Sequence, residues 1–269
     1  MLKKAIYKGV EINYSLKGNS KRTVVLLHGF LENIKVWEDY TKVLAKHNTV
    51  FAIDLLGHGK TACLGYVHTM EEMAGCVKHV LAENNKRKAV LIGHSLGGYV
   101  ALAFGDRYPD FLNGLCLFNS TAKPDSEERI KFRNRAIDVV KNNHELFIKT
   151  AIPNLFVDNK TPAIRGAIRR VLNMALNTPK QGVLAALEGM KMRPDRQIIL
   201  RFAPYPVLCI AGKKDSVVRW QDLKAQSLMC ENGSFYLSEK GGHMCLYEDK
   251  YPCLRILEKF VIKCYTPKK

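Results

Sequence analysis

The sequence predicts an α/β fold, in which a mostly parallel central sheet is flanked by helices and interrupted by an all-helical insertion. Two observations lead to this prediction. Short, continuous runs of Val, Ile and Leu alternate with amphipathic helical patterns, as in a parallel sheet that is buried on both faces. Between residues 122 and 201 the strand pattern stops and only helical patterns remain. We therefore expect a sheet-based core formed by residues 1–121 and 202–269, and a helical lid formed by residues 122–201.

The N-terminal segment has the alternation that is typical of an antiparallel hairpin. Apolar residues alternate with polar ones before and after Gly9, which predicts two strands over residues 5–7 and 10–16. We expect this hairpin at an edge of the sheet. The following run, residues 23–27, is continuously apolar and β-branched, which predicts a buried central strand.

Strands and helices alternate regularly through the rest of the predicted core. Before the insertion, the expected elements are a helix over 36–44, a strand over 49–53, a helix over 69–83, a strand over 89–92, a helix from 96 to 108 and a strand over 112–118. After the insertion, they are a strand over 206–212, a helix over 220–229, a short strand over 234–237 and a helix over 251–263. Strands that are joined through helices pair in parallel, with the helices on the faces of the sheet.

The insertion contains several signals for the start of a helix. Asp125 and Glu128 form a capping pair ahead of its first helix, and a shorter helix is expected over 144–152. A Thr-Pro pair occurs at residues 161–162 and again at 178–179. Threonine is a good N-cap and proline is favoured at the first helical position, so each pair predicts a helix start.

Ser95 lies at the junction between a predicted strand and a predicted helix, bracketed by Gly93, Gly97 and Gly98. A serine in so tight a turn has a strained backbone, and its neighbours must lack bulky side chains. The serine hydroxyl is then exposed above the sheet, and the N–H of Leu96 opens a helix, where it can donate to an anion. The pattern G-x-S-x-G in this context predicts a nucleophilic serine.

The composition narrows the functional class. Of the 269 residues, 47% are hydrophobic and 25% are charged, as in ordinary globular proteins. The formal net charge of +17 is unusual, but no nucleic-acid-binding motif accompanies it, so we expect no nucleic acid partner. We expect no membrane span, because no segment is long and apolar enough. Eight cysteines without a C-x-x-C pair favour a reduced, cytoplasmic protein.

Five short motifs of the chain occur together in one known family. They are the His28-Gly-Phe turn, the Asp54-Leu-Leu-Gly-His-Gly stretch, the Gly-His-Ser-Leu-Gly-Gly elbow, Gly-Lys-Lys-Asp215 at a strand end and Gly-Gly-His243 near the C-terminus. With these motifs in order over essentially its full length, the sequence resembles an α/β-hydrolase. In this resemblance the helical insertion corresponds to the lid of the family.

The order of the motifs also indicates the catalytic groups. A neutral serine needs an adjacent base, and the base needs an acid that orients it. In this fold the order along the chain is Ser, then Asp or Glu, then His, and Asp215 and His243 follow Ser95 in that order. Asp222 and Glu239 are the alternative acids nearby.

The negative charge that develops on the carbonyl oxygen needs two fixed hydrogen-bond donors. One expected donor is the N–H of Leu96. The resemblance implies that the second is the N–H of Phe30, directly after His-Gly. We expect the Phe30 ring, together with Leu31, to line the substrate pocket.

The remaining polar residues of these motifs are interpreted as structural. The resemblance implies that His28 supports a loop and that His58 belongs to a family-typical turn, whereas His94 should point away from Ser95. Asn119 occupies the place of the acid in some relatives but does not ionise. Because no histidine pair has metal-ligand spacing with a third ligand in view, we expect neither a metal nor a cofactor.

Basic residues are concentrated in the insertion. Residues 122–201 contain sixteen Lys and Arg against eight Asp and Glu, a net of +8 over 80 residues. At about 100° per residue, Arg129 and Arg133 fall on the apolar stripe of the first lid helix, where an unpaired charge is costly. Lys131 and Arg135 fall on its solvated face. The two stripe arginines either pair with cap carboxylates or border the cleft, where they would meet an anionic substrate or an acidic carrier protein.

The expected function is that of a serine hydrolase that cleaves a small-molecule carboxylic ester or thioester through an acyl-enzyme on Ser95. A dehalogenase or an epoxide hydrolase of this fold would need aspartate at position 95. Because that residue is serine, those two reactions are excluded. One alternative is the role of the pimeloyl-carrier-protein methyl esterases of biotin synthesis, which present lid arginines to an acidic carrier protein. Others are a C–C hydrolase, a lyase or a cofactor-free perhydrolase on the same triad, and a non-catalytic ligand-binding member.

Overall fold

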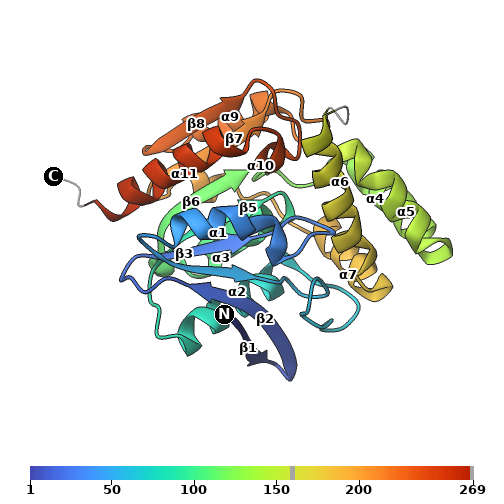
Figure 1. Cartoon of the computed structure of the whole chain (residues 1–269), viewed down its shortest axis with the longest axis horizontal. Coiled ribbons are helices and arrows are strands. Elements are labelled where there is room, and N and C mark those ends of the chain that lie inside the picture. The colour runs from blue at the N-terminus through green and yellow to red at the C-terminus, as the bar shows by residue number, and fades with distance from the viewer. Residues whose placement is uncertain (158–160, 267–269) are drawn as a thin grey trace.

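The computed structural model describes residues 1–157 and 161–266, so residues 158–160 of the predicted lid and residues 267–269 lie outside the description (Figure 1). In the described chain, eight strands form one sheet in the order β1-β2-β4-β3-β5-β6-β7-β8. The strands are β1 (Leu2–Tyr7), β2 (Val10–Lys17), β3 (Thr23–Leu27), β4 (Thr49–Ile53), β5 (Ala89–His94), β6 (Leu112–Phe118), β7 (Val207–Gly212) and β8 (Gly233–Ser238). The predicted α/β class with a central sheet is confirmed.

The pairing of the strands explains the patterns in the sequence. All neighbouring strands from β4 across β3 to β8 are parallel, whereas β1 pairs with β2, and β2 with β4, in the antiparallel direction. The hairpin expected at a sheet edge is therefore present. Every residue of β3, β4 and β5 is buried, which is why these strands are continuous apolar runs. Leu27 pairs with Gly93, so the loops that follow β3 and β5 lie side by side.

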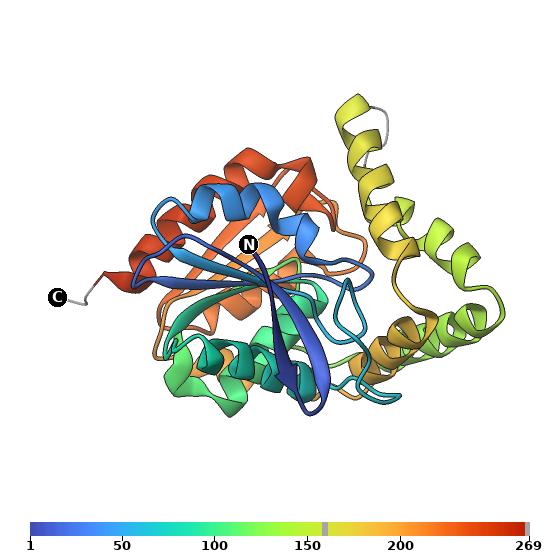
Figure 2. The same ribbon diagram turned by 60° about the horizontal axis from the view of Figure 1, so that its bottom comes forward.

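Helices cover both faces of the sheet (Figure 2). The 3-10 turn η1 (Ile34–Trp37), α1 (Glu38–Leu44) and α11 (Lys250–Tyr265) lie on one face, and α2 (Met70–Glu83) and α3 (Leu96–Arg107) on the other. The remaining elements of the core are η2 (Pro109–Phe111), α9 (Trp220–Leu228), which packs on β7 and β8, and α10 (Cys245–Glu248). Among the described helices, none is long and apolar enough to cross a bilayer.

Between β6 and β7, the regular structure of the described residues is entirely helical. The elements are α4 (Glu127–Asn142), α5 (His144–Ala151), η3 (Pro153–Leu155), α6 (Pro162–Leu176), α7 (Lys180–Lys191) and α8 (Gln197–Arg201). Helix α4 packs against α5 and α7, and α5 packs against α6. These helices project beyond one end of the sheet (Figures 1 and 2). We call residues 122–201 the helical insertion.

Two predicted helix starts in the insertion are wrong in detail. Ser126, not Asp125, caps α4, because its side chain accepts a hydrogen bond from the N–H of Arg129. Asp125 points elsewhere and forms ion pairs, as described below. Helix α7 begins at Lys180, one residue later than the Thr178 cap predicts, because Pro179 is the N-cap and the Thr178 hydroxyl makes no hydrogen bond within the described residues. The other Thr-Pro pair caps α6 as predicted.

Candidate active site

The backbone of Ser95 has the strained conformation that the elbow motif requires. Its φ is 49° and its ψ is −114°, and it separates the last residue of β5 from the first residue of α3. The flanking glycines are needed because the chain folds back on itself here. A Cβ atom on Gly93 would lie 2.2 Å from the carbonyl oxygen of Gly97, and one on Gly97 would lie 2.2 Å from that of Leu27. Strand and helix therefore meet only if both positions lack a side chain.

The structure brings Ser95, His243 and Asp215 together in one hydrogen-bonded chain. Nε2 of His243 lies 3.0 Å from Oγ of Ser95, and its Nδ1 lies 3.1 and 3.0 Å from the two carboxylate oxygens of Asp215. The N–H groups of Val217 and Val218 also donate to Asp215, at 2.7 and 3.0 Å. Burial by itself raises the pKa of the Asp215 carboxyl, but His243 and these hydrogen bonds outweigh it and hold the pKa below its ordinary value. An ionised Asp215 favours the histidine tautomer whose Nε2 can accept the serine proton.

Asn119 is a member of this site that the sequence analysis treated only as a position without an acid. It follows β6 with a φ of 48°, and its Nδ2 donates to Oδ2 of Asp215 at 2.8 Å and to the carbonyl of Gly242 at 3.1 Å. One amide therefore joins the loop of the acid to the loop of the histidine.

The two alternative acids lie elsewhere. Asp222 is paired with Lys123, and Glu239 is paired with Lys213, in both cases with partly exposed side chains. Within the described residues neither carboxylate is hydrogen-bonded to His243. Of the three acids, Asp215 alone is hydrogen-bonded to His243 within the described residues.

The two expected oxyanion donors lie on neighbouring loops. Phe30 is in the loop after β3, and Leu96 follows the elbow after β5, and these strands are adjacent in the sheet. Within the described chain, no protein group accepts a hydrogen bond from either N–H. The next residue, Leu31, has a φ of 64° and is buried. Both N–H groups are therefore free to donate to a substrate oxygen.

A buried pair, Glu32 and His94, lies next to His243 and was not predicted from the sequence. The carboxylate of Glu32 accepts a hydrogen bond from the N–H of Gly29 at 2.6 Å and lies 3.1 Å from Nδ1 of His94. Nε2 of His94 lies 3.0 Å from the carbonyl oxygen of His243. A carboxylate and a carbonyl both only accept, so the His94 ring has to carry a proton on each nitrogen. The pair is therefore ionic, with side chains that are 2% and 1% exposed.

The pKa directions of the pair agree with this geometry. Burial by itself raises the pKa of Glu32, but His94 and the N–H of Gly29 outweigh it and lower the pKa. Burial by itself lowers the pKa of His94, but the Glu32 carboxylate outweighs it and raises the pKa. The expected orientation of His94 away from the hydroxyl of Ser95 matches these bonds. The pair connects the loop of Phe30 to the loop of His243.

We expect Glu32→Gln to lower the free energy of unfolding by about 3 kcal/mol near pH 5.5, because it leaves a buried charge without its partner. His94 has the raised pKa, so its share of the stabilisation is complete below its unfolded value of 6.5 and is lost as pH rises through its folded pKa. Glu32 has the lowered pKa, so its share is complete above 4.5 and is lost as pH falls through its folded pKa. The difference between wild type and variant should therefore shrink at alkaline pH.

Urea unfolding of both proteins at about pH 5.5 and about pH 9 measures this difference. Glu11→Gln is the matched control, because Glu11 forms an exposed pair with Lys4. Such a pair contributes at most about 1 kcal/mol. A loss in Glu32→Gln that does not change with pH would show that the pair is not ionic.

The remaining motif histidines have structural contacts. Nδ1 of His28 donates to the carbonyl of Gly29, while its Nε2 accepts from the N–H of Leu55, so this ring joins two loops. His58 bonds the carbonyl of Leu56, and burial lowers the pKa of His58 to about 3. Among the described residues, no group of three or more His, Cys, Asp and Glu side chains is arranged to hold a metal ion.

A cavity of about 730 Å³ opens above Ser95 and His243. Phe30 and Leu31 line it, as expected. Most of its other wall consists of apolar side chains of the insertion: Phe132, Val139, Leu146, Phe147, Leu187 and Met190. Cavities of this size that are lined mainly by apolar groups are typical ligand sites.

Helix α4 has a second apolar row that the sequence analysis missed. Arg133, Ile137 and Val140 lie on its buried stripe, and α4 packs against α7. Phe132 and Val139 are 57% and 42% exposed and line the cavity instead. Helical periodicity assigns these two residues to solvent, because a cavity wall and a solvated face have the same pattern.

The structure separates the two arginines of the predicted stripe. Arg133 is 7% exposed and forms an ion pair with Asp125, which also pairs with Arg193 at 2.6 Å. Burial by itself raises the pKa of Asp125, but the two guanidinium groups outweigh it and lower the pKa. Arg133 therefore pairs with a carboxylate near the cap, and its side chain also lines the cavity. Arg129 borders the cavity, and its Nη2 donates to the carbonyl of Val217 at 3.0 Å.

Comparison with known proteins places the chain among hydrolases. The family model described as "Serine aminopeptidase, S33" matches residues 18–250. A pimeloyl-[acyl-carrier protein] methyl ester esterase of Klebsiella pneumoniae is 29% identical over 204 residues, 72% of this chain and 76% of that protein. The acetyltransferase component of an acetoin cleaving system of Cupriavidus necator is 37% identical over 93 residues, 35% of this chain. The match spans only 25% of that longer relative.

Two solved structures have the same fold. An esterase from Thermogutta terrifontis is 28% identical and superposes with a TM-score of 0.91, covering 99% of this chain and 100% of that one. An enol-lactonase from Burkholderia xenovorans has a TM-score of 0.88, covering 97% of this chain and 100% of that one, and is 20% identical. At that identity, the second likeness concerns the fold alone.

Proposed function

We propose that this chain, which belongs to the serine aminopeptidase S33 family and has the α/β-hydrolase fold, hydrolyses carboxylic esters or thioesters through an acyl-enzyme on Ser95. The observation that carries the proposal is the hydrogen-bonded chain from Ser95 through His243 to Asp215 at the wall of an apolar cavity. An esterase and a methyl ester esterase among the similar proteins support the choice of substrate bond.

In the first half-reaction, Nε2 of His243 takes the proton of the Ser95 hydroxyl as the oxygen attacks the carbonyl carbon. The oxygen of the tetrahedral intermediate carries the negative charge, and the N–H groups of Phe30 and Leu96 donate to it. Each such donor stabilises the transition state by on the order of 3 kcal/mol. His243 then gives its proton to the leaving alcohol or thiol, and the acyl group stays on Ser95.

The second half-reaction repeats these steps with water in place of serine. His243 takes a proton from water, the hydroxide attacks the acyl carbon, and the proton returns to Oγ of Ser95 as the carboxylic acid leaves. Asp215 keeps its charge throughout and stabilises the imidazolium that forms in each half. Asn119 and the Glu32–His94 pair hold the loops of the acid, the histidine and the oxyanion donor in place.

The cavity favours an ester with a sizeable apolar group. Its walls are apolar over much of their area, and each CH₂ group that leaves water contributes about 0.8 kcal/mol. We expect kcat/KM for p-nitrophenyl esters to rise at least tenfold from the C2 to the C8 acyl chain. A panel from C2 to C12, with time-dependent inactivation by a fluorophosphonate, measures both the preference and the covalent step.

The panel also separates the alternatives. Covalent labelling without turnover of any ester would contradict ester hydrolysis and point to another reaction of the same serine. Neither labelling nor turnover would contradict the acyl-enzyme and favour a non-catalytic ligand-binding role.

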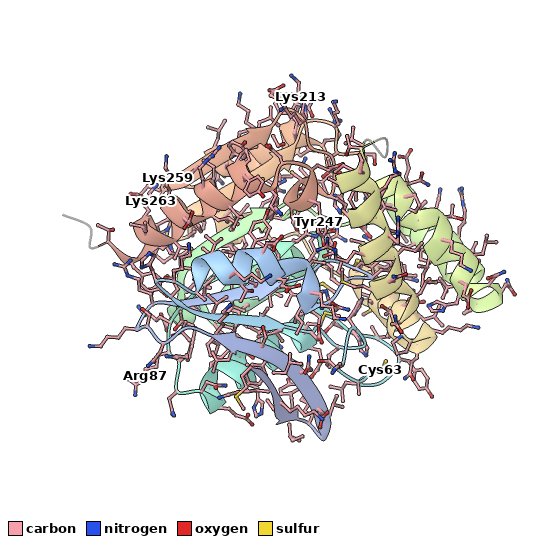
Figure 3. All side chains as sticks on the ribbon, viewed as in Figure 1. Cys63, Arg87, Lys213, Tyr247, Lys259 and Lys263 are labelled. Atoms are coloured by element: carbon pink, nitrogen blue, oxygen red, sulfur yellow. The ribbon has the colours of Figure 1, made fainter. Side chains whose placement is uncertain are left out.

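A second candidate substrate is an ester that is held on an acidic carrier protein. The name of the Klebsiella relative and the exposed cations Arg135 and Lys141 of α4 support it. Basic side chains also project from other parts of the surface, for example Arg87 and Lys259, so the charge is not confined to the insertion (Figure 3). A carrier-bound ester added to the panel should lose turnover between about 0.05 and about 0.5 M salt if charge guides its docking. Equal turnover at both concentrations would contradict this candidate.

A further inference from the structure

The charges of the cavity wall are not balanced. Glu32 is paired with His94, and Arg133 is paired with Asp125, a carboxylate that it shares with Arg193. Arg129 and Arg135 also line the cavity, and neither has a carboxylate partner within residues 1–157 and 161–266. The catalytic Asp215 is occupied by His243 and Asn119. The wall therefore carries two cations that no carboxylate of the described chain balances.

Of these two cations, Arg129 is better placed to bind an anionic group in the cavity. It is only partly exposed, whereas Arg135 lies on the exposed side of α4, where water and salt screen its charge. The carbonyl of Val217 accepts one hydrogen bond from Arg129, and the N–H of Val217 donates to Asp215 at 2.7 Å. Val217 therefore links the Arg129 guanidinium to Asp215 through two hydrogen bonds.

Arg129 also borders a second, polar cleft of about 460 Å³. This cleft and the apolar cavity share Tyr99, Arg129, Phe132 and Val217 in their walls. Two other cations of its wall are paired, Lys123 with Asp222 and Arg193 with Asp125, whereas Arg219 has no carboxylate partner among the described residues. A guanidinium has five N–H groups, and the hydrogen bond that Arg129 donates to the carbonyl of Val217 uses one of them.

We propose that Arg129 binds a negatively charged group of the substrate, so that this enzyme acts on esters that combine an apolar chain with a carboxylate. The inference rests on the proposed ester hydrolysis and names its substrate class. A guanidinium and a carboxylate form two parallel hydrogen bonds, and such charge-assisted pairs are strong where water is partly excluded. The apolar walls around Arg129 provide that environment, and the cavity that contains Ser95 extends to this side chain.

The test compares esters that differ by one charge. On the acyl side, p-nitrophenyl hydrogen suberate is compared with p-nitrophenyl octanoate; on the alcohol side, the octanoyl ester of 3-hydroxybenzoate is compared with phenyl octanoate. We expect Arg129→Met to lower kcat/KM for at least one of the charged esters tenfold or more, a loss of about 1.4 kcal/mol. Both neutral esters should stay within about threefold, since methionine keeps an apolar stem in the wall.

Lys131→Met is the matched control, because Lys131 is an exposed cation of the same helix and is not part of the cavity wall. This control should leave all four esters within about twofold, and thermal melting of both variants should match that of wild type. Equal losses for charged and neutral esters in Arg129→Met would overturn the proposal, because they would indicate a role in holding the Val217 loop. No loss for either charged ester would overturn it as well.

A binding measurement distinguishes failure of this inference from failure of the proposed function. If wild-type protein hydrolyses none of the four esters, the ester hydrolysis itself is wrong. Calorimetric titration with suberate then tests Arg129 without turnover. Weaker suberate binding by Arg129→Met than by Lys131→Met supports the anion site, and equal binding by both variants overturns it.

Discussion

We expect Ser95→Ala to lower kcat for p-nitrophenyl esters by about 10⁶-fold, the loss that removal of a serine nucleophile produces in a well-studied protease. Without the hydroxyl, no acyl-enzyme forms, and only the oxyanion donors and the cavity remain to stabilise the transition state. Intact-mass spectrometry after treatment with a fluorophosphonate should show one adduct on wild type and none on the variant.

Ser216→Ala is the matched control for this experiment. Ser216 is an exposed serine next to Asp215 that lines the same cavity, so its hydroxyl is an accessible alternative site of labelling. The Ser216 variant should still form the adduct. Labelling of Ser95→Ala to the same extent as wild type would disprove the assignment of the nucleophile.

Asp215→Asn should lower kcat by about 10⁴-fold while the protein stays folded. The amide oxygen can still accept from the N–H groups of Val217 and Val218, but the amide cannot hold His243 in the tautomer that accepts the serine proton. Steady-state kinetics and far-UV circular dichroism measure the two parts of this expectation. Glu239→Gln, an exposed carboxylate that pairs with Lys213, is the control and should change kcat less than threefold.

The position of Asn119 allows a sharper version of the same test. Its amide nitrogen lies 2.8 Å from a carboxylate oxygen of Asp215, so a carboxylate at position 119 would lie next to the place that the acid occupies. We expect the added substitution Asn119→Asp to raise kcat of the Asp215→Asn variant at least tenfold. On its own, Asn119→Asp should reduce activity, because two adjacent carboxylates repel and share a proton.

If Asp215→Asn by itself lowers kcat less than tenfold, Asp215 is not the acid that orients His243.

Local patterns in the chain were enough to predict the central sheet and most of its elements. The run over residues 23–27 is a buried strand because its neighbours cover both faces, and such burial requires a continuous apolar sequence. The hairpin around Gly9 has one face toward solvent, and its alternation follows from that. Each of these features depends on residues that are close together in sequence, so periodicity is sufficient to identify it.

The three groups of the proposed triad were also accessible from the sequence. Gly93 and Gly97 mark the elbow, because the backbone approaches itself there at distances that exclude a side chain. Chain order then restricts the acid and the base to a few positions. It did not decide between Asp215 and the nearby carboxylates, which required the contact with His243.

Long-range contacts determined the rest, and no local pattern encodes them. Glu32 and His94 are 62 residues apart, and His94 and the carbonyl of His243 are 149 residues apart, so their pairing exists only after the sheet has formed. Arg129 and Arg133 have the same place on the helical stripe by periodicity. Both line the cavity, but Asp125 pairs with Arg133, whereas Arg129 has no carboxylate partner within the described residues and is hydrogen-bonded to the loop of the acid. The strands and the elbow of this protein follow from short-range sequence, whereas the charge in the cavity beside Ser95 depends on which distant side chains folding brings into contact.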